Sequence, residues 1–263
     1  ISLYEPEYIT VPLQDDGIDL ELLEKAFNSS NVKFMYTVPS FQNPSGVTYS
    51  TSKRKVVAEL VEKHGVVLLE DNPYGELCFS GNIKPPIKSY LGETSVLMGS
   101  FSKITVPGIR LGWVYAEDKV MQKLKIVKQA ADLHSNYMAQ RILYQFLIDN
   151  DLDLHVQRIK KAYSAQRDCM IQSMEAQFPE LVSFTRPEGG MFLWGILPEE
   201  ASSLELFKSA IQEKVAFVPG IPFHLEGRGE NTFRLNFSNS SNDLIETGIS
   251  RLAKIINTYL DLN

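Results

Sequence analysis

The 263-residue sequence predicts an α/β fold, with a mostly parallel sheet flanked by helices and a smaller C-terminal α/β domain. In the first half of the chain, apolar β-type runs alternate with segments of helical periodicity, which is typical of βαβ units. Residues 66–69 are apolar without interruption, as in a strand buried on both faces of a parallel sheet. A composition of 44% hydrophobic and 22% charged residues suits one large or two modest domains with a real core.

Helices and strands are expected to alternate in the first half of the chain. Asp19 can cap a helix whose apolar side chains recur at helical spacing as far as Phe27. Residues 52–63 predict a second helix, closed by Gly65 as the C-terminal glycine. The strands of this half are expected at residues 8–12, 34–38, 66–69, 95–98 and 111–116. Such alternation predicts parallel pairing through right-handed crossovers.

A helical region separates the two halves of the chain. The helical pattern starts at Asp118 and continues to about Phe178, where Pro179 stops it. We place the domain boundary inside this region, which gives a large domain of residues 1–155 and a small C-terminal domain of residues 156–263. In the small domain, strands are expected at 182–185, 191–196, 215–218 and 232–237, and helices at 203–212 and 243–260.

Composition argues against several classes of function. The net charge is −6 and no basic cluster stands out, so we expect no nucleic-acid binding through this part of the protein. No apolar run is long enough to cross a membrane. Cys78 and Cys169 are isolated thiols that suit the cytoplasm. The four histidines lack the spacing of metal ligands, so no metal site is expected.

The segment of residues 99–113 carries the densest group of reactive side chains. Ser100, Ser102 and Arg110 are the residue types that bind a phosphate dianion. Lys103 lies between them and can form an imine with an aldehyde. Together they predict a phosphorylated aldehyde cofactor, of which pyridoxal phosphate is the common example. The alternative is a plain loop with a solvated lysine.

Polar residues follow three different predicted strands. Asn43, Asp71 and Lys103 each lie just after a strand, and ligands of parallel sheets bind outside the carboxyl ends of the strands. We therefore expect these three residues on one rim. Asp71 can hold a pyridine nitrogen protonated, which makes the ring an electron sink. Alternatively, it caps a helix or forms a structural salt bridge.

Three further residues have both a binding and a structural interpretation. Asn43 can donate to the ring oxygen of the cofactor, or simply shape a turn before Pro44. The Tyr74 hydroxyl can reach the same oxygen, while its ring can instead pack in the core. Arg234 occupies an alternating position in an aromatic strand, where burial without a partner is costly. A substrate carboxylate matches its guanidinium, and a structural ion pair is the alternative.

Five stretches, in this order along the chain, carry a resemblance to a known family. They are residues 39–46, 70–77, 100–113, 186–194 and 233–237. With them, the chain resembles the fold-type I pyridoxal-phosphate enzymes, namely the class I and II aminotransferases. It is most similar to the branch of kynurenine and 2-aminoadipate aminotransferases, and the similarity extends over essentially the whole chain.

The resemblance implies a role for each candidate residue. Lys103 is the catalytic residue and forms a Schiff base with pyridoxal 5′-phosphate, and Asp71 pairs with the pyridine nitrogen. The other residues implied to bind the cofactor are Asn43 and Tyr74 at the ring oxygen, and Ser100, Ser102 and Arg110 at the phosphate. Arg234 takes the α-carboxylate of the substrate, and Asn43 is also part of the substrate site.

The resemblance also implies an activity and an assembly. The expected reaction is transamination between an amino acid and a 2-oxo acid, commonly 2-oxoglutarate, by a cytoplasmic homodimer. One alternative is another reaction on the same scaffold, such as β-elimination or decarboxylation. Another is the cofactor- and effector-binding domain of a winged-helix transcription regulator, which a helix-turn-helix upstream of Ile1 would favour. A degenerate structural homologue is a third, and the complete set of site residues argues against it.

One departure from the family concerns the start of the chain. Family members carry a further part before the region that matches Ile1. It contributes a glycine-containing phosphate loop, an aromatic residue that stacks on the cofactor ring, and some of the substrate pocket. We therefore expect the sequence to be a piece of a longer polypeptide. This piece alone is expected to bind the cofactor weakly or not at all, and to be inactive.

Overall fold

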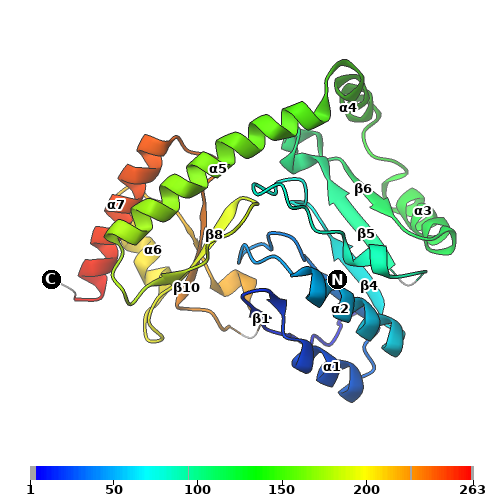
Figure 1. The fold of residues 1–263 in the computed structure, drawn as a ribbon, viewed down its shortest axis with the longest axis horizontal. Helices are drawn as coiled ribbons and strands as arrows, with labels where there is room; N and C mark the ends of the chain where they lie inside the picture. Colours follow the sequence, from blue (N-terminus) through cyan, green and yellow to red (C-terminus); the bar gives the residue numbers. More distant parts are fainter. Residues whose placement is uncertain (1–3, 94, 226, 262–263) are drawn as a thin grey trace. The chain divides into compact units, whose positions relative to one another are not determined.

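The computed structural model describes residues 4–93, 95–225 and 227–261, and it contains two compact units (Figure 1). The first unit consists of Ile1–Ser40, Val47–Pro73 and Lys84–Gln145. The second unit consists of Phe41–Gly46, Tyr74–Ile83 and Phe146–Asn263. Each unit has its own sheet and its own hydrophobic core.

The first unit is built on a four-stranded sheet. Its strands, in spatial order, are β3 (Phe34–Thr37), β4 (Val67–Asp71), β5 (Ser95–Ser100) and β6 (Gly112–Tyr115). β3 with β4 and β4 with β5 are parallel, while β5 with β6 is antiparallel. The predicted mostly parallel sheet is thus confirmed. The antiparallel edge arises because a short segment joins β5 to β6, and a parallel crossover needs a longer one.

The two predicted helices of the first half are present. In α1 (Leu20–Ser29), the Asp19 carboxylate accepts a hydrogen bond from the Leu22 backbone N–H at 3.0 Å, as an N-cap should. α2 (Thr51–His64) ends at Gly65, whose φ of 62° is the left-handed conformation of a C-terminal glycine. The apolar side chains of both helices form one core with Met35 and Leu68 of the sheet.

The sheet of the first unit is buried on one face rather than two. Along β4, Leu68 and Glu70 are fully buried, whereas Val67 is 38% exposed. β3 alternates in the same way, with Phe34 and Tyr36 exposed. The expectation of a strand at residues 66–69 buried on both faces is therefore wrong here. The core with α1 and α2 takes alternate side chains, and those on the opposite face stay accessible.

The prediction of a first strand at residues 8–12 is also wrong. Residues 8–12 form no regular structure, and Tyr8 and Ile9 are exposed. Instead, the two-residue strands β1 (Leu13–Gln14) and β2 (Gly17–Ile18) pair antiparallel across the next turn. An extended apolar run needs a neighbouring strand to satisfy its backbone hydrogen bonds. Within the part of the chain that the structure describes, the segment of residues 8–12 has no such neighbour.

Three helices follow β6, in the region where periodicity predicts helical structure. They are α3 (Asp118–Asp132), α4 (Tyr137–Asp149) and α5 (Leu152–Gln177). The two units divide within α4, between Gln145 and Phe146, whereas the boundary expected at residue 155 falls inside α5. Two early segments join the second unit, and one of them is fixed by a β-bridge between Cys78 and Gly189. Such long-range pairing leaves no trace in local sequence patterns.

The second unit contains an antiparallel sheet covered by helices. Its strands, in spatial order, are β7 (Ser183–Phe184), β8 (Phe192–Ile196), β10 (Thr232–Asn236) and β9 (Val218–Pro219). Besides α5, its helices are α6 (Ser203–Gln212) and α7 (Asn242–Tyr259), and Figure 1 shows α7 beside the long α5. The predicted C-terminal α/β organisation is confirmed. Of the strand expected at residues 215–218, only Val218 is in a strand, as the first residue of β9.

None of the helices in the described ranges combines the length and the apolar character that a membrane span requires.

Candidate active site

The residues predicted from the sequence fall into two groups. The first unit holds Asp71, Ser100, Ser102, Lys103 and Arg110, and the second holds Asn43, Tyr74 and Arg234.

In the first unit, two neighbouring parallel strands deliver the candidate acid and the candidate amine. Asp71 is the last residue of β4, and the register places it opposite Met98 of β5. β5 ends at Ser100, and Lys103 ends the short 3₁₀ turn η3 (Phe101–Lys103) that follows. Since parallel strands end at the same edge of a sheet, Asp71 and the segment with Lys103 lie at one edge. This edge is where α/β sheets bind ligands.

The candidate phosphate segment is shaped by its own backbone. The Ser100 hydroxyl accepts from the Ser102 backbone N–H at 3.1 Å and thereby caps η3. Arg110 has a φ of 54°, uncommon for a residue other than glycine, and closes the turn η4 (Pro107–Ile109). Its side chain is exposed. Lys103 is half-buried, so the alternative of a fully solvated lysine does not describe it.

Gly99, just before this segment, lies against the side chain of Trp113. A Cβ atom on Gly99 would overlap the indole of Trp113, which lies directly across the β5–β6 pair. The close approach of the two strands therefore fixes the backbone from which Ser100 and Lys103 are presented.

The Asp71 carboxylate is held by a residue that the sequence did not single out. Tyr36 on β3 donates its hydroxyl to Asp71 Oδ2 at 2.7 Å. The structural alternatives for Asp71 fail within the described ranges, because no helix there begins next to it and it forms no ion pair. Sequence reasoning could have placed Tyr36 on a strand, but only the strand register makes it a neighbour of Asp71.

The residue before Asp71 belongs to a buried polar network behind the sheet edge. Glu70 is fully buried, and its carboxylate accepts from the backbone N–H groups of Ile87 and Lys88 at 2.9 and 2.8 Å. Arg54 of α2 lies 4.0 Å away. Burial raises the pKa of Glu70, and burial lowers the pKa of Arg54, because desolvation disfavours both charges.

Arg54 connects this network to the segment that leads toward Asn43. Its guanidinium donates to the carbonyls of Tyr49, Pro39 and Pro85, and to the Ser40 hydroxyl, at distances of 2.8 to 3.1 Å. The network was missed in the sequence, although one signal was present. Two acidic residues in succession at the end of a buried strand must point to opposite faces, so one of them needs an internal partner.

In the second unit, Arg234 lies close to two aromatic rings. Its Cζ is 4.2 Å from the centroid of Phe192 and 5.0 Å from that of Phe223, both within the range of cation–π attraction. Its Nη1 donates to Asn43 Oδ1 at 2.7 Å. Burial lowers the pKa of Arg234, and the nearby Tyr74 opposes this effect.

Part of the Arg234 guanidinium has no partner within the described residues. Its Nε is buried and makes no hydrogen bond, and no ion pair to this arginine is found there. The structural ion pair that the sequence left open is therefore absent from the described part of the chain. A carboxylate from a ligand would satisfy both the charge and the orphaned donor.

The loop that carries Asn43 packs on a pair of glycines. A Cβ on Gly189 or on Gly190 would collide with Phe41, two residues before Asn43. Within the loop, the Gln42 side-chain oxygen accepts from the backbone N–H and the hydroxyl of Ser45, at 2.8 and 2.7 Å. The glycine pair thus does more than bend the chain before β8, because it allows the Asn43 loop to approach.

The ring of Tyr74 packs in the core, which is one of the two interpretations that the sequence allows. It is 4% exposed, and its ring meets the ring of Phe192 edge to face at 5.9 Å. Phe192 therefore contacts both Tyr74 and Arg234. Phe192 and Phe223 are functional candidates that sequence analysis did not find, since aromatic residues in strands and turns usually signal core packing.

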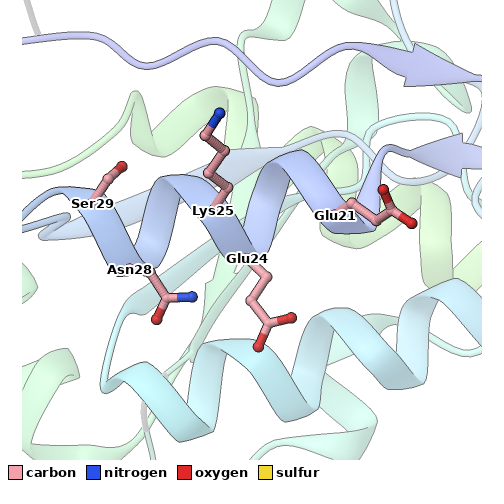
Figure 2. Close-up of a pocket in the computed structure, with 5 residues that line it drawn as sticks. All are labelled: Glu21, Glu24, Lys25, Asn28 and Ser29. Carbon is pink, nitrogen blue, oxygen red and sulfur yellow. The ribbon is translucent and has the colours of Figure 1, made fainter.

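An open depression with a volume of about 430 Å³ lies elsewhere, on the surface of α1. It is lined by Glu21, Glu24, Lys25, Asn28 and Ser29. Figure 2 shows these side chains spreading in different directions from a single helix. Glu24 is already paired with Lys63 at 2.6 Å. The depression contains none of the candidate catalytic residues and is an ordinary feature of a charged helix surface.

Comparisons with known proteins identify the family of the chain. Residues 1–252 match the family described as aminotransferase class I and II. The chain is 41% identical to aromatic-amino-acid aminotransferase 1 of Thermococcus litoralis, over 96% of this chain and 62% of that protein. The crystal structure of Pyrococcus horikoshii kynurenine aminotransferase, in complex with PMP, superposes with a TM-score of 0.94 at 40% identity. That match covers 98% of this chain and 66% of the other.

A transcription regulator is a more distant relative. An uncharacterised HTH-type regulator of Bacillus subtilis is 27% identical over 93% of this chain and 50% of its own length. The chain therefore spans between half and two thirds of the length of these three proteins. Because the family match extends over residues 1–252, the chain belongs to the class I and II aminotransferases.

Proposed function

We propose that this chain forms the cofactor-binding and reactive part of an aminotransferase. The enzyme exchanges the amino group of an amino acid with a 2-oxo acid, and 2-oxoglutarate is the acceptor that we favour. The observation that carries the proposal is the position of two residues at one edge of the sheet, in a chain of this family. Asp71 ends β4, and Lys103 lies just after the adjacent parallel strand β5.

The residues of the first unit fit pyridoxal 5′-phosphate. The cofactor supplies an aldehyde that bonds to amines and a ring that accepts electrons. The hydroxyls of Ser100 and Ser102 and the cation of Arg110 suit its phosphate. Asp71 keeps the ring nitrogen protonated, because a fixed carboxylate favours the charged form of a nearby base. The Lys103 amine holds the cofactor covalently.

The Lys103 amine also moves the proton that transamination requires. With the cofactor and an amino donor bound, the amine would take the proton from the α-carbon of the substrate as a general base. The same group would then give that proton back as the general acid on the cofactor side. Lys103 is half-buried at the end of η3.

The residues of the second unit suit the substrate and the cofactor ring. Arg234 binds the α-carboxylate, since its guanidinium is cationic, partly buried and has an orphaned donor. Asn43 holds Nη1 of that guanidinium and also takes part in the substrate site. With Tyr74, it is proposed to donate to the ring oxygen of the cofactor.

A regulator domain is the second candidate, supported by the relative from Bacillus subtilis. The enzyme is favoured because identity to aminotransferases reaches 41%, against 27% for that regulator. Another reaction on the same residues, such as β-elimination or decarboxylation, would differ in its products. Formation of the 2-oxo acid without ammonia or carbon dioxide supports transamination, and release of either supports a rival.

We also propose that the protein works as a homodimer in the cytoplasm. Its two cysteines are both free thiols, which suits a reducing compartment. The helix α3 has no buried residue, and Leu124, Ile126 and Val127 are exposed on it. Apolar side chains gathered on a surface helix favour a protein partner, and a second copy of the chain is the partner that the family resemblance implies.

Substitution of Lys103 by alanine tests the proposed function. In the full-length protein loaded with pyridoxal phosphate, Lys103→Ala should abolish the visible absorbance of the covalently held cofactor. Turnover should fall by roughly a thousandfold, the range lost with a general base. Lys125→Ala, on an exposed residue of α3, is the matched control and should leave both quantities unchanged. Normal turnover by Lys103→Ala would refute the assignment.

A further inference from the structure

Tyr36 and Asp71 come from neighbouring strands and lie on the same face of the sheet. β3 and β4 are parallel, and their register pairs Tyr36 with Leu69. Side chains along a strand alternate between faces, so Asp71, two residues after Leu69, shares a face with Tyr36. Thr37 and Glu70 follow the opposite face and are buried, whereas Tyr36 is 53% exposed.

The contact between the two side chains is a short hydrogen bond. The Tyr36 hydroxyl donates to Asp71 Oδ2 at 2.7 Å, the length typical of an O–H donor to an ionised carboxylate. The terminal torsion of an aspartate is soft, so a carboxylate without such a donor rotates over a broad range. No second hydrogen-bond donor to this carboxylate is found in the part of the chain that the structure describes.

We propose that Tyr36 is a positioning residue that orients the Asp71 carboxylate toward the cofactor ring. This inference rests on the proposed function, in which Asp71 pairs with the ring nitrogen. The phenol fixes the rotation of the carboxylate by binding Oδ2, which leaves Oδ1 for the ring N–H. By sharing the negative charge, the hydrogen bond also sets how strongly Asp71 attracts the proton on that nitrogen.

A purely structural role explains Tyr36 less well. About half of the side chain is accessible, so its ring contributes little to the core, which takes Met35 and Leu68 instead. The group that distinguishes tyrosine from phenylalanine at this position is the hydroxyl, which donates to Asp71. Removal of that one oxygen atom leaves the ring in place and takes away the hydrogen bond to Asp71.

The test uses Tyr36→Phe in the full-length protein. The Kd for pyridoxal phosphate, titrated into the cofactor-free protein, should rise roughly tenfold, as expected when one hydrogen bond to a charged group is lost. The pH midpoint of the absorbance change of the bound cofactor should shift, while the unfolding temperature of the cofactor-free protein stays the same. Tyr115→Phe is the matched control, an exposed tyrosine on β6 of the same sheet, and should change none of these quantities.

A double-mutant cycle separates this role from an indirect effect. If Tyr36 acts through Asp71, Tyr36→Phe should not weaken cofactor binding further in an Asp71→Asn background. A full additional loss in that background overturns the inference, as does a Tyr36→Phe variant with the wild-type Kd and pH midpoint. Failure of the wild-type protein to bind pyridoxal phosphate would instead overturn the proposed function, and this inference with it.

Discussion

Arg234 shows how one side chain can be prepared for a ligand by its neighbours. Rings of Phe192 and Phe223 lie near its guanidinium, and Asn43 accepts from Nη1. The contacts hold the flat group in one orientation, so little conformational entropy remains to be lost when a carboxylate binds. The cost is an unsatisfied buried Nε. Buried donors without a partner are rare in native structures and call for an explanation, and the proposed carboxylate ligand supplies one for Nε.

Substitution of Arg234 by lysine should weaken substrate binding specifically. Lysine keeps the charge but loses the flat donor fork that matches a carboxylate, which costs roughly 1.5–3 kcal/mol. The KM values for amino acid and 2-oxo acid should both rise by at least about tenfold, with the cofactor spectrum unchanged. Arg186→Lys, an exposed arginine of the same unit paired with Glu175, is the control for steady-state kinetics. Unaltered KM values in Arg234→Lys would contradict the carboxylate assignment.

Among the elements, β4 illustrates how strand alternation divides two neighbouring acids. Glu70 enters the helix-covered side of the sheet, where backbone N–H groups and Arg54 receive it. Asp71 takes the other face and meets Tyr36. One residue thus anchors the strand end and the next remains available for chemistry. The buried network ties β4, α2 and the 3₁₀ helix η2 (Ile87–Tyr90) into one support.

Loss of Arg54 should destabilise the first unit far more than loss of a surface ion pair. In Arg54→Leu, the Glu70 carboxylate stays buried without its cation, and several carbonyls lose their donor. Breaking such a pair costs about 3–5 kcal/mol. Lys63 lies on the same helix as Arg54 and forms an exposed ion pair with Glu24 of α1. Lys63→Leu removes this pair and should lower the free energy of unfolding by less than about 1 kcal/mol.

Urea unfolding of the two variants provides the measurement. If Arg54→Leu lowers the free energy of unfolding no more than Lys63→Leu does, the network around Glu70 does not stabilise the fold.

At the scale of the whole molecule, the two units contribute different parts of the proposed chemistry. The first unit carries the candidate amine, the acid and the phosphate residues, and the second carries the candidate carboxylate receptor. The loop Phe41–Gly46 and the segment Tyr74–Ile83 belong to the second unit although they come early in the chain. This interleaving places Asn43 and Tyr74 in the same unit as Arg234, far away in sequence.

Charge on α3 should disrupt the proposed dimer. Ile126 and Val127 are 60% and 63% exposed, and burying two carboxylates at an apolar interface is strongly unfavourable. The double variant Ile126→Glu/Val127→Glu should therefore elute as a monomer in size-exclusion chromatography with light scattering, while Lys125→Glu leaves the assembly intact. A double variant that remains dimeric would place the interface elsewhere.

The sequence by itself determined the fold class, most element boundaries and the identity of the candidate residues. Capping at Asp19 and Gly65, strand-type runs and helical periodicity are local signals, and the family motifs are contiguous stretches. Periodicity alone overestimated the order of residues 8–12 and the burial of β4, because both depend on neighbours distant in the chain.

Only the tertiary structure decided which partner each candidate meets. The pairing of Tyr36 with Asp71 depends on strand register, and the rings around Arg234 come from segments some forty and eleven residues before it. The position of Arg54 beside Glu70 depends on how α2 packs on the sheet. Local sequence encodes the direction in which a side chain leaves its strand or helix. The residues that this side chain then contacts are set by packing between elements, which no local sequence pattern specifies.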